Sequence, residues 1–360
     1  MWPDPRLLDL LGIELLIVQA PLAGANGAAM AAAVCAAGGL GSLPCAMLDA
    51  AQVRAEVARI RSATERPFNL NFFCHRPEPP DPARETAWRA RLAAYYAEFG
   101  LDPAAVAPAP NRAPFDAALC DLVEELAPPV VSFHFGLPAP PLLARVKGAG
   151  CRVLSSATTV AEARWLEQHG VDAVIAQGVE AGGHRGMFLG DAVTTQVGTV
   201  ALVPQVVDAV RVPVIASGGI ADGRGVAAAF ALGASGVQIG TAYLLTGEST
   251  ISELHRAALR GAADDGTALT NLFSGRPARG VVNRLMREVG PLSGLAPPFP
   301  TAGAALAPLK ARAEAAGDAG FSPLWSGQAG PLARPIGSGE LTRALARDAL
   351  ARLGALGSAG

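Results

Sequence analysis

The chain has 360 residues, of which 51% are hydrophobic and 17% are charged, and its formal net charge at pH 7 is -2. This composition allows a sizeable buried core and lacks the basic face or basic run that is typical of nucleic-acid binding. The five cysteines form no C-x-x-C pair and are odd in number, so neither a disulfide framework nor a metal site is expected.

The sequence also lacks the features of export or of membrane insertion. Its first residues show neither the basic segment nor the continuous apolar segment of a secretory signal. The most apolar stretch, residues 28–37, is short and flanked by glycine, whereas a membrane span needs about 20 apolar residues. We therefore expect a cytoplasmic monomer or homodimer, with no nucleic-acid and no membrane partner.

Short β-branched runs alternate with alanine-rich helical runs along the chain, as in parallel sheets that are buried on both faces. The expected strands cover residues 15–19, 40–43, 68–72, 130–135, 152–156, 173–177, 212–216 and 236–239. Eight parallel strands close naturally into a barrel, so the pattern predicts an α/β protein with a (β/α)8, or TIM, barrel fold. Asp49, Thr159 and Asp222 are expected to begin helices over 49–61, 159–169 and 222–232.

Two stretches are too long for ordinary barrel loops. One follows the third strand and holds a helical pattern over 83–99, and the other lies towards the C-terminus and includes a helical pattern over 302–317. We expect these two stretches to pack together as a small helical cap over one mouth of the barrel. The predicted division is a barrel of 1–74 and 128–250 with 321–350 packed back on it, a cap and substrate region of 75–127 and 251–320, and a flexible tail of 351–360.

Polar side chains gather at the carboxyl ends of six predicted strands, where barrel enzymes place their chemistry. They are Gln19, Asn69, Asn71, Ser132, His134, Gln177, Ser217, Gln238 and Thr241. A buried amide needs hydrogen-bond partners, and the amides of Gln19, Asn71 and Gln177 suit the mixed donor and acceptor edge of a flavin ring. Taken singly, each amide equally fits a bond to a neighbouring loop.

Glycines follow both of the last two strands, in the segments 217–219 and 238–241. They let backbone N–H groups approach an anion closely, and the loops after strands seven and eight are the usual phosphate site of such barrels. We therefore expect a phosphate group here. The alternative is that these glycines only make tight turns.

Two histidines are candidates for the chemistry. His184 lies in the run Gly-Gly-His-Arg-Gly, whose glycines allow the loop to fold inward, although a loop histidine is also common on a surface. His134 alternates with Phe133 and Phe135, so it points away from them, either into the pocket or into the core. His75 follows the third strand, and we place it at the pocket rim. The motifs G-x-S-x-G, H-E-x-x-H and G-x-G-x-x-G are absent.

Read together, these segments resemble the nitronate monooxygenase family, formerly called 2-nitropropane dioxygenases. The resemblance spans nearly the whole chain and rests on residues 19–24, 68–73, 131–136, 177–186, 216–225, 236–241, 274–279 and 321–328. The Gly-Gly-His-Arg-Gly run is its most specific part. The resemblance implies an FMN-dependent enzyme that uses O2 to oxidise alkyl nitronates, with nitroalkanes as further candidate substrates, to a carbonyl compound and nitrite.

The resemblance also implies roles for individual residues. The FMN-binding residues would be Pro21, Leu22, Ala23, Asn71, Gln177, Gly182, Ser217, Gly218, Gly219, Gln238, Ile239, Gly240, Thr241 and Gln328. His184 matches the catalytic histidine and would remove the α-proton of a neutral nitroalkane, while His134 matches a second pocket histidine and would bind the nitro oxygens. Relatives often carry tyrosines and a lysine in the segment that closes the pocket. Residues 298–306 hold no tyrosine and only Lys310 lies nearby, which predicts a more apolar roof.

Three other functions stay open from the sequence. The same fold serves NAD(P)H-dependent flavin reductases of quinones or enoyl thioesters, which oxidation of the nicotinamide would reveal. A non-redox barrel acting on a phosphorylated substrate would lack a flavin spectrum. A flavin-binding module without activity would show that spectrum and no turnover.

Overall fold

The computed structural model describes residues 2–104 and 112–357, and it contains the predicted barrel. Eight parallel strands lie in the order β1-β9-β8-β6-β5-β4-β3-β2. They are β1 (Ile17–Gln19), β2 (Gly41–Pro44), β3 (Phe68–Phe73), β4 (Val130–His134), β5 (Arg152–Ala157), β6 (Ala173–Gln177), β8 (Val214–Ser217) and β9 (Gly236–Ile239). The two end strands also meet, because the N–H of Leu40 donates to the carbonyl of Ile17 at 3.0 Å and the N–H of Gln19 donates to the carbonyl of Leu40 at 2.9 Å. The (β/α)8 fold is thereby confirmed.

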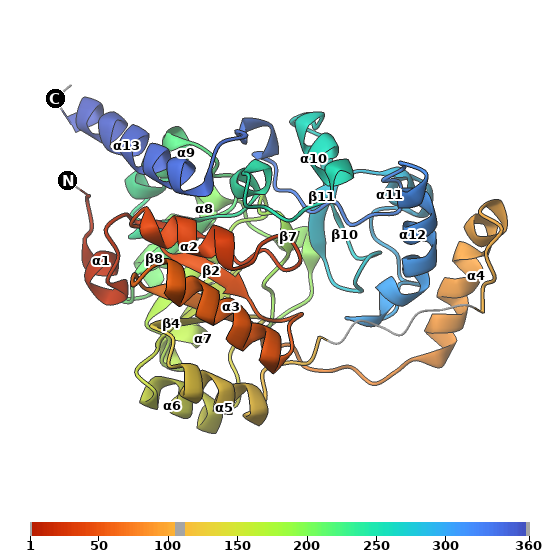
Figure 1. Ribbon diagram of the computed structural model, residues 1–360, viewed down its shortest axis with the longest axis horizontal. Coiled ribbons are helices and arrows are strands. Elements are labelled where there is room, and N and C mark those ends of the chain that lie inside the picture. The colour runs from red at the N-terminus through yellow and green to blue at the C-terminus, as the bar shows by residue number, and fades with distance from the viewer. Residues whose placement is uncertain (1, 105–111, 358–360) are drawn as a thin grey trace.

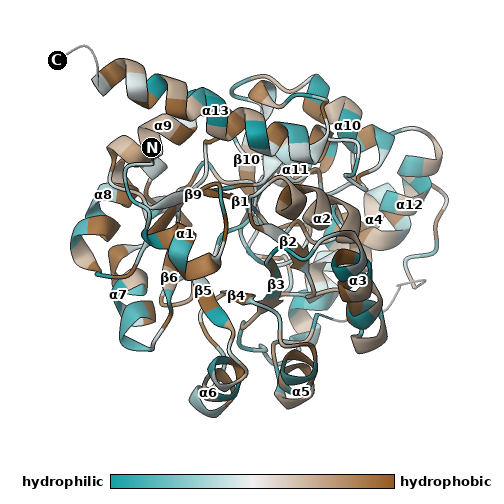
Figure 2. Cartoon of the chain, turned by 60° about the vertical axis from the view of Figure 1, so that its left-hand side comes forward, coloured by the Kyte–Doolittle hydropathy of each residue, from teal (hydrophilic) through white to brown (hydrophobic). Residues whose placement is uncertain are grey.

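Helices surround the ring of strands, as Figure 2 shows. They are α1 (Arg6–Leu11), α2 (Ala28–Ala36), α3 (Ala50–Ala63), α5 (Ala117–Leu126), α6 (Pro140–Gly148), α7 (Val160–Gln168), α8 (Thr199–Ala209), α9 (Gly223–Ala231) and α13 (Ser338–Gly357). The three predicted helix starts are confirmed. Asp49, Thr159 and Asp222 each accept hydrogen bonds from backbone N–H groups of the first turn that follows, which satisfies donors that a helix start leaves free.

The barrel interior is apolar for most of its length and polar near one mouth. Every residue of β1, β2 and β3 is buried, as expected for strands that are covered on both faces. Near the mouth, the Asn69 amide donates to the hydroxyls of Ser42 at 3.0 Å and Ser132 at 2.8 Å. The Asn71 amide donates to the same Ser132 hydroxyl at 2.9 Å. These bonds join three strands beneath the site.

A second apolar cluster joins the two long insertions beside the barrel (Figure 1). Its helices are α4 (Pro82–Glu98), α11 (Arg284–Val289) and α12 (Ala307–Ala315), together with the 3-10 turn η3 (Thr301–Leu306). Helix α10 (Glu253–Arg260) packs on the 3-10 turns η2 (Thr241–Leu245) and η4 (Gly330–Leu332), and η1 (Val193–Thr195) lies elsewhere in the chain. Trp88 of α4 donates to the carbonyl of Ala302 at 3.1 Å, and the Tyr96 hydroxyl donates to that of Ala305 at 2.7 Å. The two insertions thus pack on each other.

A small antiparallel sheet ties this helical unit to the barrel. It has the order β10-β11-β7, with β10 (Thr267–Thr270), β11 (Ala278–Val281) and β7 (Gly183–His184). We did not predict this sheet, because a two-residue strand carries no hydrophobic period. In β7, His184 pairs with Ala278 and Gly183 with Arg279. The glycine-rich loop that follows β6 is therefore held between the barrel and the insertion.

The C-terminal helix differs from the expectation for the end of the chain. Helix α13 packs on α9 and α2 and continues through Gly357 (Figure 1). Residues 351–357 are thus helical where we expected a flexible tail, and Leu353 packs on the core. Residues 358–360 lie outside the described part. No helix in the described ranges is long and apolar enough to cross a membrane.

Candidate active site

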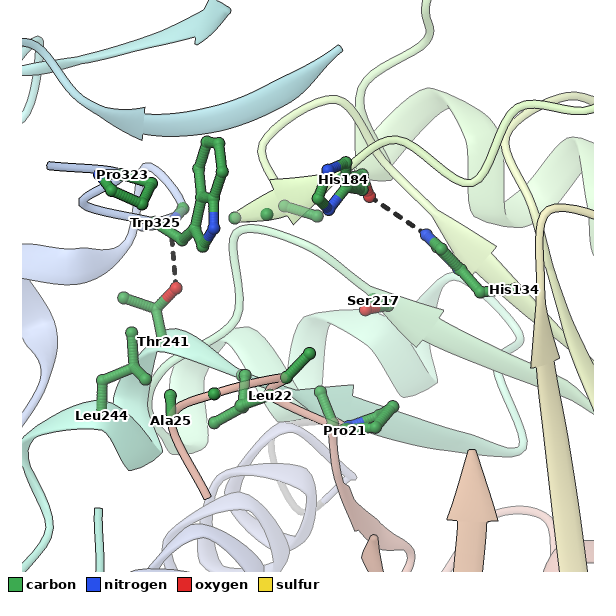
Figure 3. Close-up of a pocket in the computed structure, with 18 of the residues that line it drawn as sticks. Pro21, Leu22, Ala25, His134, His184, Ser217, Thr241, Leu244, Pro323 and Trp325 are labelled. Atoms are coloured by element: carbon green, nitrogen blue, oxygen red, sulfur yellow. Dashed lines mark hydrogen bonds between the residues drawn. The ribbon is translucent and has the colours of Figure 1, made fainter. Parts of the chain in front are cut away.

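A cavity of about 500 Å³ lies at the carboxyl ends of the barrel strands and reaches the insertion (Figure 3). Most of the sequence-predicted site residues line it: Pro21, Leu22, Ala23, Asn71, His134, Gln177, Gly182, His184, Ser217, Gly218, Gly219, Gln238, Gly240 and Thr241. Ile239 and Gln328 do not line it. The Ile239 side chain is buried in the barrel core, and that of Gln328 is exposed. Gln19 binds the Ser42 backbone instead.

His184 reaches the cavity from β7 and is held by one side-chain hydrogen bond. Its Nε2 lies 2.8 Å from the hydroxyl of Ser274, and that hydroxyl donates to the carbonyl of Arg276 at 3.2 Å. The tautomer with its proton on Nε2 satisfies both contacts, because the Ser274 hydroxyl then accepts from His184 and donates to the carbonyl. Nδ1 then keeps a free lone pair, and no hydrogen bond to Nδ1 is found among the described residues. His184 therefore presents a proton acceptor.

His134 lines the cavity, but both of its ring nitrogens bind the protein. Nδ1 lies 2.6 Å from the Ser156 hydroxyl, and Nε2 lies 3.3 Å from the carbonyl of His184 (Figure 3). A carbonyl only accepts, so Nε2–H donates to it. Binding of nitro oxygens by His134, which we expected, would require this bond to break. In the observed arrangement His134 holds the backbone of His184, and its catalytic role stays a prediction.

The imidazoles of this region are kept neutral by their surroundings. Burial, together with the charge of nearby arginines, lowers the pKa of His134 to about 3 and that of His75 to about 4. Burial, followed by the charge of Arg112, also places the pKa of His184 well below its usual value. At neutral pH all three rings are therefore uncharged, and His184 is in the form that accepts a proton. His75 packs on Phe299 and does not line the cavity.

The loop that carries His184 is fixed by a network of buried hydrogen bonds. The Gln177 amide donates to the carbonyl of His184 at 3.0 Å and accepts from the N–H of Gly186 at 2.8 Å. Arg185 is 1% exposed and donates to the carbonyls of Gly178 at 2.6 Å and Gln177 at 2.7 Å. Gln177 thus lines the cavity, while its amide serves the loop.

Backbone N–H groups and a hydroxyl gather at the opposite end of the cavity. Gly218 and Gly219 have φ of 107° and 69°, a region that favours glycine, and so they turn the chain directly after β8. Thr241 begins η2 after β9, and its hydroxyl accepts from the N–H of Gly327 at 2.9 Å. Ser217, Gly218, Gly219 and Thr241 all line the cavity. This arrangement fits a phosphate group.

Comparison with known proteins agrees with this geometry. A model of the family described as "Nitronate monooxygenase" matches residues 4–348. A nitronate monooxygenase of Paraburkholderia phytofirmans is 44% identical, over 95% of this chain and 94% of that protein. The chain belongs to the nitronate monooxygenase family. The structure of a nitroalkane oxidase from Streptomyces ansochromogenes superposes with a TM-score of 0.87 at 40% identity, over 98% and 99% of the two chains. That of FabK from Thermotoga maritima gives 0.75 at 29% identity, over 99% of each.

Nitronate monooxygenases are flavin-dependent oxidoreductases that act on small molecules, and this chain is such an enzyme. Its cavity fits a flavin nucleotide. The side-chain oxygen of Gln238 is buried in the lining without a hydrogen-bond partner among the described residues. A buried acceptor without a donor is costly, and the N–H groups of a flavin ring would satisfy it. A Cβ at Gly182 would lie 2.4 Å from the N of Gly327, so the protein wall there is closed to any side chain.

Several residues of this nitronate monooxygenase site were not predicted from the sequence. Ser274 orients His184, Ser156 binds His134, and the Trp325 ring lies 5.5 Å from that of His184. Ser274 and Trp325 lie in segments that carry the family resemblance, so closer attention to those segments would have found them. Arg112 lies in a proline-rich run with no motif. Arg112 and Lys310 line the cavity, so its roof is more charged than we expected.

The buried neutral histidines predict a loss of stability in acid. The unfolded chain binds protons on these imidazoles near pH 6.5, whereas the folded chain holds the pKa of His75 near 4 and that of His134 near 3. Below pH 6.5 the unfolded state therefore binds more protons, and the free energy of unfolding should fall, by about 1.4 kcal/mol per pH unit for each such histidine. Urea unfolding at pH 7.5, 6 and 5 measures this slope. His75→Phe should reduce it, and equal stability at all three pH values would contradict the assignment.

Proposed function

We propose that this enzyme oxidises alkyl nitronates with O2 to a carbonyl compound and nitrite, and that its flavin is FMN. The observation that carries the proposal is the position of His184, whose free Nδ1 lies in a cavity with a phosphate-binding end. Family membership and the likeness to a nitroalkane oxidase support the same substrate class. A neutral nitroalkane would enter the reaction after loss of its α-proton.

The residues proposed to hold FMN lie around the cavity wall. Ser217, Gly218, Gly219, Gly240 and Thr241 would bind the phosphate through backbone N–H groups and hydroxyls. Asn71, Gln177, Gly182, Gln238 and the backbone of Pro21–Ala23 would surround the ring. Contact of Gln328 or Ile239 with the cofactor would have to come from the backbone, since neither side chain lines the cavity. The bound flavin supplies an electron acceptor for the nitronate and a partner for O2.

The proton chemistry falls to the chain's own residues. His184 would take the α-proton of a neutral nitroalkane on Nδ1, while Ser274 keeps the ring oriented through Nε2. The positive charge formed in this way would be carried by the imidazole of His184. The backbone carbonyl of His184 accepts hydrogen bonds from His134 and Gln177, which hold the residue in place. We further propose that residues 75–127 and 251–320 form the substrate-facing cap, because Arg112 and Lys310 reach the cavity from these segments.

Anaerobic mixing tests the reaction class. The purified enzyme, saturated with FMN, is mixed with an alkyl nitronate in one cell and with NADH or NADPH in another, and the absorption of the oxidised flavin is followed. We expect rapid loss of this absorption with the nitronate and none with the nicotinamides. Loss with a nicotinamide alone would overturn the proposal and support a reductase, with His184 as proton donor to its acceptor. A colourless protein that takes up no flavin would contradict both.

A further inference from the structure

One cation of the cavity, Arg112, has no ion-pair partner among the described residues. Arg112 lines the cavity, and the Nε of its guanidinium is buried without a hydrogen-bond partner among the described residues. No ion pair to Arg112 is found in the described ranges, and residues 105–111 contain no acidic residue. Burial lowers the pKa of this guanidinium, but an arginine side chain keeps its charge in proteins. A half-buried charge whose Nε is buried without a partner is costly, so this one has the character of a binding group.

The surroundings of Arg112 place this charge at the reacting end of the cavity. Its guanidinium carbon lies 5.8 Å from the centre of the Phe299 ring, and the Phe299 and His184 rings are 5.6 Å apart. The charge of Arg112 also acts on the pKa of His184. Arg112 and His184, which both line the cavity, thus lie next to the same Phe299 ring.

The carboxylates of the cavity do not neutralise Arg112. Glu180 accepts from the N–H and the hydroxyl of Thr199, at 2.9 and 2.8 Å. Glu314 accepts from the hydroxyl of Ser322 at 2.7 Å and lies 3.8 Å from Lys310. The other ionisable groups that act on His184 are His134, Arg276 and His75, and none of them is an anion. Among the described residues Arg112 therefore has no anionic partner, which leaves its charge for an anion that enters the cavity.

We propose that Arg112 binds the two oxygens of the ionised substrate and so selects the nitronate over the neutral nitroalkane. This inference rests on the proposed function and adds a specificity residue to it. A nitronate carries its charge on two coplanar oxygens, as a carboxylate does, and the planar guanidinium donates to such a pair in parallel. His134, from which we expected this role, already donates to the carbonyl of His184. Nitrite, the proposed product, carries the same O–N–O group.

Two variants of Arg112 and one control test the assignment. Arg112→Gln removes the charge, Arg112→Lys keeps the charge without the planar pair of donors, and Arg89→Gln removes an exposed arginine of α4 that does not line the cavity. We expect Arg112→Gln to raise the KM for propyl-1-nitronate roughly tenfold or more, since charged hydrogen bonds are the stronger ones. Arg112→Lys should recover part of this loss. The KM for 1-nitropropane should change less than about threefold in each variant.

Calorimetric titration with sodium nitrite gives a readout that does not need turnover. The FMN-loaded wild-type enzyme and Arg89→Gln should bind nitrite with the same Kd, and Arg112→Gln should bind it roughly tenfold more weakly. If nitrite binding depends on Arg112 but no nitronate is oxidised, the proposed function fails and the anion site stands. If nitronates are oxidised and both the KM and the nitrite Kd are unchanged in Arg112→Gln, the anion site is wrong. If Arg112→Gln raises the KM for the nitronate and the KM for the nitroalkane by the same factor, Arg112 does not select between the two substrates and the proposal is wrong.

Discussion

Replacing His184 by asparagine should lower kcat/KM for a neutral nitroalkane by about two to four orders of magnitude, the range of a lost general base. The same variant should oxidise a preformed nitronate within about threefold of the wild-type rate, because that substrate has no α-proton to lose. The reason lies in the tautomer that satisfies both contacts of Ser274, which leaves Nδ1 without its own proton. Burial and Arg112 keep the pKa of this ring low, so the ring is uncharged at neutral pH and its Nδ1 lone pair is not already protonated.

Steady-state rates with 1-nitropropane and propyl-1-nitronate, measured side by side on the same preparation, decide this assignment. His169→Asn is the matched control, because His169 stacks on Trp165 outside the cavity and is exposed. It should leave both rates unchanged. If His184→Asn loses both activities to the same extent, His184 does not act as the base, and its contribution is to position the substrate or the flavin.

The barrel was predictable because strands that are buried on both faces have short, nearly continuous apolar sequences. Strands such as Ala173–Gln177 and Val214–Ser217 are apolar up to their last residue, and Asp or Thr residues mark the starts of several helices between the strands. The turn of the proposed phosphate site was predictable for a related reason, since Gly218 and Gly219 adopt a conformation that favours glycine. In each case the structure depends on the residue types within one short segment, so that segment alone was enough to predict it.

The parts of the site that depend on distant pairing were not predictable. Strand β7 exists only because Gly183 and His184 pair with a segment almost 100 residues later, and this pairing also brings Ser274 to His184. Gln177 lines the cavity, but its side-chain amide is hydrogen-bonded to the backbone of His184 and Gly186. The sequence left open whether this amide binds a ligand or a neighbouring loop. Arg112 has no periodicity or motif around it, so its entry into the cavity is set by tertiary packing alone.

Adding one methyl group at Gly182 should impair cofactor binding more than any other conservative change at the cavity wall. A Cβ there would lie 2.4 Å from the N of Gly327, 2.6 Å from the C of Ser326 and 3.0 Å from the hydroxyl oxygen of Thr241. Two of these are backbone atoms, so the strain cannot be relieved by a side-chain rotation. Either the segment 326–328 or the loop that carries His184 must therefore move. Movement of the segment 326–328 would also disturb the hydrogen bond that the N–H of Gly327 donates to the hydroxyl of Thr241.

We therefore expect Gly182→Ala to weaken FMN binding by about tenfold to hundredfold, the range that overpacking of 1–3 kcal/mol produces. Fluorescence titration of the flavin-free protein with FMN measures this Kd directly. Gly190→Ala is the matched control, because the same loop offers open space around a Cβ at that position and Gly190 does not line the cavity. Since a wall that moves also displaces Thr241, Gly182→Ala should lower activity even at saturating FMN. An alanine variant with wild-type FMN affinity and wild-type activity would show that this wall yields freely, and that the close contact at Gly182 does not shape the cofactor site.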